Sequence, residues 1–373
     1  MSREKEKMDI PLVDLAIQHR EIEADIKRGF EAVFEQTAFV LGPALVDFET
    51  AYAKFAGVRH CIGVGSGTDA IELILRAQKI GPGDEVIVPT NTFIATALAV
   101  SRVGAVPVFV DCDPDYYLID SAKTRSCIGE HTRAILAVDL YGQIAPHEEL
   151  EAYARGRNIA VIEDAAQSHG ARRNGCFAGG FGVAAATSFF PGKNLGAYGD
   201  GGAVLTNDSE FAQAVRELRN CGGTVKHEHP RIGVNSRLDS LQAVVLRAKL
   251  DRLPRWNDER RAAAARYDEL LAGSSGLVLP KVKQGNESVW HLYVVRVPER
   301  DRVLAQLQAA GIAAGIHYPT PCHLQGAYQS LGFAKGSFPV AEQAADEILS
   351  LPIYPGITQD QQARVSEVLL RAI

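Results

Sequence analysis

Short apolar runs rich in β-branched residues alternate with segments of helical period along the first half of the chain. The apolar runs span 85–89, 106–110, 134–138 and 159–162, and helical segments such as 95–103 and 147–157 separate them. Strands that are apolar along their whole length are buried on both faces, which is typical of parallel sheets joined by helical crossovers. The alternation therefore predicts an α/β fold, with a mostly parallel sheet between layers of helices.

The pattern changes after Asn235. Residues 238–271 have a helical period, and Pro254 is expected to break or kink this helix because proline lacks the backbone donor that a helix interior needs. A strand over 289–297, a helix over 302–310 and a terminal helix over 359–372 follow. We therefore expect a smaller α+β domain after a boundary near residue 250.

Charge and cysteine usage exclude several classes of protein. The 373 residues carry a formal net charge of -6, which gives no general attraction to nucleic acid. The first seven residues are highly charged, and no stretch approaches the roughly 18 apolar residues of a membrane span. The six cysteines form no Cys-x-x-Cys pair, so we expect reduced thiols, no metal site and a cytoplasmic location.

Lys193 lies between a short apolar run and a glycine-rich loop, within residues 188–202. Apolar surroundings favour the neutral amine, which can attack a carbonyl carbon. Asp164 ends the apolar segment 158–164, which would deliver it to the carboxyl edge of the sheet, where ligands bind. A lysine that binds an aldehyde and a carboxylate that keeps a pyridine nitrogen protonated together indicate pyridoxal 5'-phosphate.

Each of these two residues has a simpler interpretation when taken alone. Most lysines are solvated surface residues, and most strand-end aspartates cap a turn or a helix. Lys193 belongs to neither of two familiar lysine motifs. A P-loop would need glycine at 187 and serine or threonine at 194, where the chain has Thr187 and Asn194, and Ser188 is too distant for a Ser-x-x-Lys pair.

A glycine-rich turn over 61–70 leads into a helical stretch and predicts a phosphate site. Its glycines let the backbone approach an anion, and the helix start offers unpaired N–H groups. Gly65, Gly67 and Ala70 also satisfy the dinucleotide-binding fingerprint, with Asp84 near the spacing of a ribose-binding acid. That acid should end a strand, whereas Asp84 precedes one, so an NAD-binding oxidoreductase is the less favoured alternative.

Seven segments together resemble the DegT/DnrJ/EryC1/StrS family of sugar aminotransferases, which have the pyridoxal-phosphate fold type I. Their order and spacing carry the resemblance, which runs along nearly the whole chain. The segments span 10–15, 65–68, 81–89, 92–96, 163–170, 188–202 and 235–243. The resemblance implies a large cofactor-binding domain over 16–250 and a small domain formed by 1–15 together with 251–373.

The resemblance assigns a role to each matched residue. Lys193 would hold the cofactor covalently and move a proton, and Asp164 would contact the pyridine nitrogen. The other cofactor contacts would be Gln167 at the ring hydroxyl, Phe93 on the ring face, Gly67, Thr68 and Ser188 at the phosphate, and Asn235 from the neighbouring subunit. This last contact implies a homodimer with shared active sites. Taken alone, Phe93 would be a core aromatic residue and Asn235 a turn residue.

The resemblance also implies a transamination in two halves. L-glutamate would leave pyridoxamine 5'-phosphate, which would then aminate a nucleotide-linked ketosugar. Relatives that dehydrate sugars have histidine at the lysine position, so Lys193 favours transamination. Residues 291–296 and 315–328 are most similar to members that aminate C3 of a dTDP-linked 3-keto-6-deoxyhexose. Amination at C4 of a 4-keto-6-deoxysugar, amination of a keto-cyclitol, and a regulator that binds pyridoxal phosphate are the alternatives.

Three residues are candidates for contacts with the sugar. His317 and Tyr318 lie in the segment that resembles the C3-aminating members, and His169 follows Gln167 closely. Each has an alternative interpretation, as a packing residue for His317 and Tyr318 and as a hydrogen-bonded histidine at a helix start for His169. No DNA-binding segment or basic stripe is visible in the C-terminal region, which favours an enzyme over a regulator.

Overall fold

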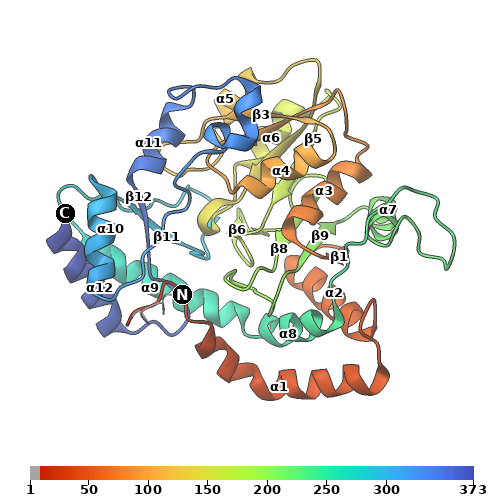
Figure 1. The fold of residues 1–373 in the computed structure, drawn as a ribbon, viewed down its shortest axis with the longest axis horizontal. Coiled ribbons are helices and arrows are strands. Elements are labelled where there is room, and N and C mark those ends of the chain that lie inside the picture. Colours follow the sequence, from red (N-terminus) through yellow and green to blue (C-terminus); the bar gives the residue numbers. More distant parts are fainter. Residues whose placement is uncertain (1–8) are drawn as a thin grey trace, which may run out of the picture.

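A seven-stranded sheet forms the centre of the computed structural model, which describes residues 9–373 (Figure 1). In spatial order its strands are β1 (His60–Val64), β9 (Gly202–Thr206), β8 (Ala184–Ser188), β5 (Ala160–Asp164), β4 (Thr132–Val138), β2 (Glu85–Pro89) and β3 (Val106–Val110). The pairs from β8 across to β3 are parallel, and β9 runs antiparallel to both of its neighbours. The predicted α/β fold with a mostly parallel sheet is confirmed.

Helices cover both faces of this sheet, which is why its central strands are apolar throughout. On one face pack α3 (Gly67–Ala77), α4 (Ile94–Arg102) and α7 (Ser209–Arg219). On the other lie α2 (Pro43–Ala56), α6 (His147–Ala154) and α8 (Ser240–Leu250). Alternate residues of one strand serve the two faces: Ile162 of β5 belongs to the first core and Val161 to the second.

The strand boundaries expected from the sequence agree closely for the buried parallel strands, since 85–89 and 106–110 coincide with β2 and β3. The strand expected over 289–297 is wrong in its first half, because β11 covers only Tyr293–Arg296. The N–H groups of Val289 and Leu292 donate instead to the carbonyls of Gly142 and Tyr141, at 2.9 and 3.4 Å. The loop that follows β4 therefore accepts hydrogen bonds from residues 289–292 in place of a neighbouring strand.

The C-terminal part is built around β11 and β12 (Ile348–Leu351), which pair antiparallel. Around this pair gather α9 (Leu253–Leu271), α10 (Arg300–Ala309), α11 (Pro339–Glu347) and α12 (Gln359–Ala372), to the left in Figure 1. Pro254 lies in the first turn of α9, where its missing N–H has no intrahelical partner to lose. The break expected at Pro254 is thus confirmed.

The start of the described chain packs onto the C-terminal part. The Ile10 N–H donates to the Gly311 carbonyl at 3.1 Å, and the Ala313 N–H donates to the Ile10 carbonyl at 2.8 Å. Ile10 also shares an apolar core with residues of α9, α10 and α12. These contacts support the proposal that the N-terminal residues belong to the small domain. Residues 1–8 of that proposed domain lie outside the described residues, and the division near residue 250 stays a prediction.

The helix α1 (Leu15–Gln36) then runs alongside α8 at the lower edge of the molecule (Figure 1). Its neighbour α8 also packs against α2, so that α8 is enclosed from two sides. Within residues 9–373, no helix combines the length and the apolar character that crossing a membrane requires. The remaining helix of the first half, α5 (Ser121–Ser126), is short and packs against α6.

We expect Ile162→Ala to destabilise the protein, because Ile162 is fully buried at the centre of the strand that carries Asp164. Truncating a buried isoleucine to alanine costs about 2–5 kcal/mol. The same change at Ile232, which is 92% exposed, should cost less than about 0.5 kcal/mol. Urea unfolding followed by circular dichroism measures both. Equal losses for the two variants would contradict the assignment of this core.

Candidate active site

The carboxyl ends of β5 and β8 bring the two predicted catalytic residues to one edge of the sheet. Asp164 is the last residue of β5 and pairs with Val138 of β4 and Ala186 of β8. Lys193 follows the end of β8 by five residues. The charges of Asp164 and Lys193 each influence the pKa of the other, so the two side chains are close neighbours.

The Asp164 carboxylate is buried, at 5% exposure, and two donors hold it in place. Its Oδ2 accepts a hydrogen bond from the Thr96 hydroxyl at 2.8 Å, and its Oδ1 accepts one from the Ala166 N–H at 3.2 Å. Burial raises the pKa of Asp164, while the bond from Thr96 opposes this shift. Within residues 9–373 no lysine or arginine forms a salt bridge with this carboxylate, so its charge is left for a ligand.

The Lys193 amine is kept partly neutral near physiological pH. Burial lowers the pKa of Lys193 to about 8, and the charge of Asp164 opposes that shift. The Nζ atom makes no hydrogen bond within the described residues, whereas the backbone N–H donates to the Phe190 carbonyl at 2.9 Å. An unpaired, partly neutral amine beside a carboxylate can bind an aldehyde carbon.

Asn194 anchors the loop that carries Lys193. Its Nδ2 donates to Asn257 Oδ1 and to the Val289 carbonyl, both at 3.0 Å, and its Oδ1 accepts from His291 Nδ1 at 3.1 Å. Sequence reasoning missed this role, although a polar residue directly after the lysine in an otherwise apolar loop was an available signal. The anchor ties the Lys193 loop to α9 and to the segment just before β11.

The first turn of α3 and the end of β8 form a cradle for an anion. Ser66 caps the helix by accepting from the Asp69 N–H at 3.1 Å, which leaves the N–H groups of Gly67 and Thr68 without intrahelical partners. A Cβ atom on Gly67 would lie 2.6 Å from the Cβ of Ser188, so only glycine permits this approach. Free N–H groups at a helix start beside a serine hydroxyl fit a phosphate group.

Gln167 and two aromatic residues form one wall beside Asp164. Gln167 Oε1 accepts from the Tyr141 N–H at 2.8 Å, and its Nε2 donates to the Tyr318 hydroxyl at 3.1 Å. The ring of Phe93 is 51% exposed, with its centroid 5.3 Å from that of Tyr318. An exposed ring at the start of α4, braced by a second ring, offers a flat surface to a planar ligand.

The two histidines predicted to contact substrate are both held neutral but differ in access. His317 is partly exposed, its Nδ1 lies 2.8 Å from Ser350 Oγ, and its carbonyl accepts from the Tyr141 hydroxyl. Burial and the charge of Lys193 lower the pKa of His317 to about 4. His169 is 1% exposed and its Nε2 lies 2.9 Å from Thr187 Oγ1. His169 thus occupies a packing position, whereas His317 is open to a ligand.

Asn235 stands apart from the other predicted cofactor contacts. It is exposed, and its side chain makes no hydrogen bond within residues 9–373. The adjacent Ser236 hydroxyl instead accepts from the Gly65 N–H at 3.0 Å and donates to Asp69 Oδ2 at 2.8 Å. The segment therefore braces the cradle through Ser236, while the Asn235 side chain is exposed.

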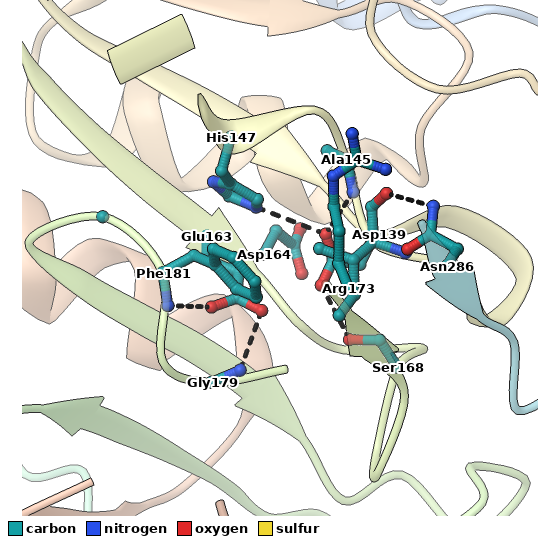
Figure 2. Close-up of polar contacts among 12 residues, drawn as sticks. Asp139, Ala145, His147, Glu163, Asp164, Ser168, Arg173, Gly179, Phe181 and Asn286 are labelled. Atoms are coloured by element: carbon teal, nitrogen blue, oxygen red, sulfur yellow. Dashed lines mark hydrogen bonds and ion pairs between the residues drawn. The ribbon is translucent and has the colours of Figure 1, made fainter. Parts of the chain in front are cut away.

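A buried polar network supports the strand end behind Asp164 (Figure 2). Asp139 accepts from the Ala145 N–H and the Ser168 hydroxyl, both at 2.9 Å. Glu163 accepts from the N–H groups of Gly179 and Phe181, and burial beside Asp139 raises its pKa well above the ordinary value. His147 Nε2 lies 3.4 Å from Asp139, and these three groups bring one ligand-type atom each within 4.8 Å of one another.

The network consists of carboxylates that are already satisfied by protein donors, so its role is structural. Asp139 connects the loop of Tyr141 to the segment that carries Gln167, because it binds residues on both sides of the site. Its own N–H donates to the Asp164 carbonyl at 3.0 Å. The network therefore fixes the backbone from which Asp164 and Gln167 project.

We expect Asp164→Asn to stabilise the cofactor-free protein at neutral pH. The folded-state pKa of Asp164 is raised, mainly by burial, so the ionised carboxylate disfavours folding at pH 7 and protonation removes this penalty. The unfolding midpoint of the variant should exceed that of the wild type at pH 7–8. The difference should shrink as the pH falls through the folded-state pKa. Differential scanning calorimetry measures both, and a lower midpoint for the variant at pH 8 would contradict the expected sign.

The sequence profile of the DegT/DnrJ/EryC1/StrS aminotransferase family matches residues 20–370. A dTDP-3-amino-3,4,6-trideoxy-alpha-D-glucose transaminase of Streptomyces venezuelae is 44% identical over 369 residues, which is 99% of this chain and 97% of the relative. A protein of Geobacillus stearothermophilus named pleiotropic regulatory protein is 45% identical over 362 residues, covering 96% and 97% of the two chains.

Solved structures agree with these relatives. The crystal structure of S. venezuelae DesV in complex with a ketimine intermediate superposes with a TM-score of 0.95 at 44% identity, covering 97% of this chain and 98% of that one. NtdA from Bacillus subtilis, solved with bound cofactor PMP, has a TM-score of 0.88 at 30% identity, with coverage of 100% and 86%. The predicted fold type is confirmed, and the chain belongs to the DegT/DnrJ/EryC1/StrS aminotransferase family.

Proposed function

We propose that this protein transfers an amino group from L-glutamate to C3 of a nucleotide-linked 3-ketosugar, with pyridoxal 5'-phosphate as cofactor. The observation that carries the proposal is the pair of a buried Asp164 and a partly buried Lys193, with the anion cradle of Gly67 and Ser188 at the same edge of the sheet. A dTDP-linked 3-keto-6-deoxyhexose is the proposed acceptor. The reaction belongs to the biosynthesis of deoxyamino sugars.

The proposed cofactor contacts follow from the chemistry of each group. Lys193 Nζ would bind the aldehyde, Asp164 would face the pyridine nitrogen, and Phe93 would lie against the ring. The N–H groups of Gly67 and Thr68, with the Ser188 hydroxyl, would hold the phosphate, and Gln167 would face the ring hydroxyl. When bound, pyridoxal phosphate supplies an electron-withdrawing ring that stabilises negative charge on the substrate carbon.

The residues of the chain supply positioning and proton transfer. Lys193, with a pKa lowered to about 8, has an appreciable neutral fraction at physiological pH, and its Nζ can accept a proton from the substrate carbon and return it to another carbon. Asp164 is held by Thr96 and Ala166 in a buried setting, where its negative charge acts strongly on a nearby pyridinium. Burial of both groups strengthens their electrostatic effect on the reacting atoms.

The proposed sugar contacts lie on the wall formed by Tyr318 and His317. The neutral imidazole of His317 leaves its Nε2 without a partner within residues 9–373, because Ser350 engages only Nδ1. A neutral imidazole and a phenol can exchange hydrogen bonds with sugar hydroxyls without adding charge. The S. venezuelae relative, whose name specifies a 3-amino dTDP-sugar, supports C3 and dTDP over the alternatives.

We further propose a cytoplasmic homodimer in which Asn235 of one subunit reaches the phosphate bound by the other. The exposure of Asn235 supports this contact, since its side chain has no partner within residues 9–373 of its own subunit. Exposed apolar side chains on the α1–α2 side, Phe34, Phe39 and Val46, also suit an interface with a second copy.

A regulatory function is the second candidate, because the relative from G. stearothermophilus carries a regulatory name at 45% identity. A regulator would keep the same cofactor contacts without needing turnover of a sugar. Binding of the cofactor alone therefore does not separate the two functions, whereas amination of a ketosugar does.

Lys193→Ala should abolish the covalent link to the cofactor. Borohydride reduction followed by peptide mass spectrometry should find the cofactor on Lys193 in the wild type and on no residue in the variant. Lys54→Met is the control, because Lys54 is exposed on α2. The cofactor should still bind the Ala variant noncovalently through the phosphate cradle. A reduced adduct on a lysine other than Lys193 in the wild type would overturn the assignment.

Incubation with L-glutamate and a panel of nucleotide sugars tests the acceptor. The panel pairs dTDP- and UDP-linked 3-keto sugars with the matching 4-keto sugars and a free keto-cyclitol, and NMR locates the new amine. We expect the dTDP-3-keto-6-deoxyhexose to have the highest kcat/KM, because a site built to bind one hydroxyl pattern rejects a misplaced one by several orders of magnitude. Amination only at C4 or only of the cyclitol would refute the substrate, and no amination at all would favour the regulator.

A further inference from the structure

Lys249 is a buried cation that the proposed chemistry does not use. It lies near the end of α8, is 2% exposed, and forms no salt bridge with any carboxylate within residues 9–373. Burying an ammonium without a counter-ion is costly, and methionine or leucine would pack at such a position at lower cost. The amine of Lys249 compensates part of this cost through a contact that an apolar side chain could not make.

That contact is made with the loop of the catalytic lysine. Lys249 Nζ donates to the Gly196 carbonyl at 2.6 Å, three residues beyond Lys193, and lies 4.8 Å from the centroid of the Tyr198 ring. The backbone is tight at this point, since a Cβ on Gly196 would lie 2.2 Å from the Pro191 carbonyl oxygen. The Ala197 N–H donates to the Phe189 carbonyl at 2.8 Å, which closes the loop back onto β8.

A second residue of α8, Gln242, also forms a hydrogen bond with the same loop. Gln242 Oε1 accepts from the Tyr198 N–H at 2.8 Å, and Gln242 and Lys249 are two helical turns apart, so they share one face of the helix. The Tyr198 hydroxyl lies 2.6 Å from His19 Nδ1, which adds α1 to the support. At the position after Lys193, Asn194 ties the same loop to Asn257 of α9.

We propose that Lys249 is a positioning residue, which pins the Gly196 carbonyl so that the Lys193 amine stays desolvated beside Asp164 and ready to bind the cofactor aldehyde. The inference rests on the proposed function. The charge of Lys193 acts on the pKa values of Asp164, His169, His291 and His317, which are therefore the titratable groups around it. Lys249 acts on Lys193 through the loop, together with Gln242, and not by direct contact.

Releasing the loop should raise the pKa of Lys193. A loosened loop lets water reach the amine, and hydration favours the ammonium. The pKa of Lys193 then moves from about 8 toward its ordinary value. Burial also lowers the pKa of Lys249 itself to about 8, which agrees with a strongly desolvated amine.

The test compares wild type, Lys249→Met, Lys249→Arg and Lys54→Met after removal of the cofactor. The rate of covalent binding of pyridoxal phosphate is followed between pH 6 and 10, and each profile gives the apparent pKa of Lys193. We expect Lys249→Met to raise this pKa by about one unit, which slows binding about tenfold at pH 7. Lys249→Arg, which keeps a charged donor, should recover part of the shift, and Lys54→Met should match the wild type.

Thermal unfolding of the same proteins separates positioning from a general structural role. Loss of an unpaired buried charge offsets the unsatisfied Gly196 carbonyl, so the midpoint of Lys249→Met should fall by no more than about 4 °C. An unchanged pKa in a folded Lys249→Met would overturn the inference. If that variant does not fold, Gln242→Leu must give the same direction of shift, and a wild-type pKa there would also overturn it. Wild-type protein that binds no cofactor at Lys193 would instead refute the proposed function.

Discussion

The parallel pairing of β4, β5 and β8 is the constraint on which the site depends. Because the three strands end at the same edge, Asp139, Asp164 and Ser188 arrive together without any contact between their side chains being required. The groups that follow then complete the site: a loop after β8 carries Lys193, and the turn after β1 carries Gly67. The strands hold Asp164 and Ser188 in fixed positions, and the loops that follow the strands carry Lys193 and Gly67.

The buried polar groups around this edge are costly to maintain. Asp164, Glu163 and Lys249 all have pKa values displaced in the direction that burial of a charge dictates. Backbone N–H groups and the Thr96 hydroxyl donate to the two carboxylates, and the Gly196 carbonyl accepts from Lys249, so the cost is reduced but not removed. A site that holds charges ready for a ligand is therefore less stable than an apolar core of the same volume would be. Cofactor binding should recover part of that stability.

Much of this architecture was accessible from the sequence because the informative segments are local. The strands 85–89 and 106–110 are continuous apolar runs, and the cradle is a glycine turn followed directly by a helix. A strand was wrongly predicted for residues 289–292, because their β-branched and aromatic side chains favour one. In the structure, N–H groups of this segment donate instead to the loop that carries Tyr141 and Gly142. The strand propensity of a segment depends on its own residues, whereas its pairing into a sheet also depends on which neighbouring segment the tertiary structure places beside it.

The supporting residues were less accessible for the same reason. Thr96 lies four residues after Thr92, in the segment 92–96 that contributes to the family resemblance. The sequence therefore contained a signal for a residue that supports Asp164. The sequence signal for Lys249 was weak. It consists of a lysine on the same buried face of α8 as Val245 and Leu246. Asn257 had no signal, since its partners Asn194 and His169 lie 63 and 88 residues earlier in the chain.

The distance along the chain between Asn194 and its partners has a consequence for biosynthesis. The Lys193 loop leaves the ribosome before Asn257 and Val289, which hold it in the finished protein. During translation the nascent chain thus has its lysine and its phosphate cradle without the anchor that sets their relation. Covalent capture of the cofactor by Lys193 is therefore expected only after the C-terminal part has been made and has docked against the Lys193 loop.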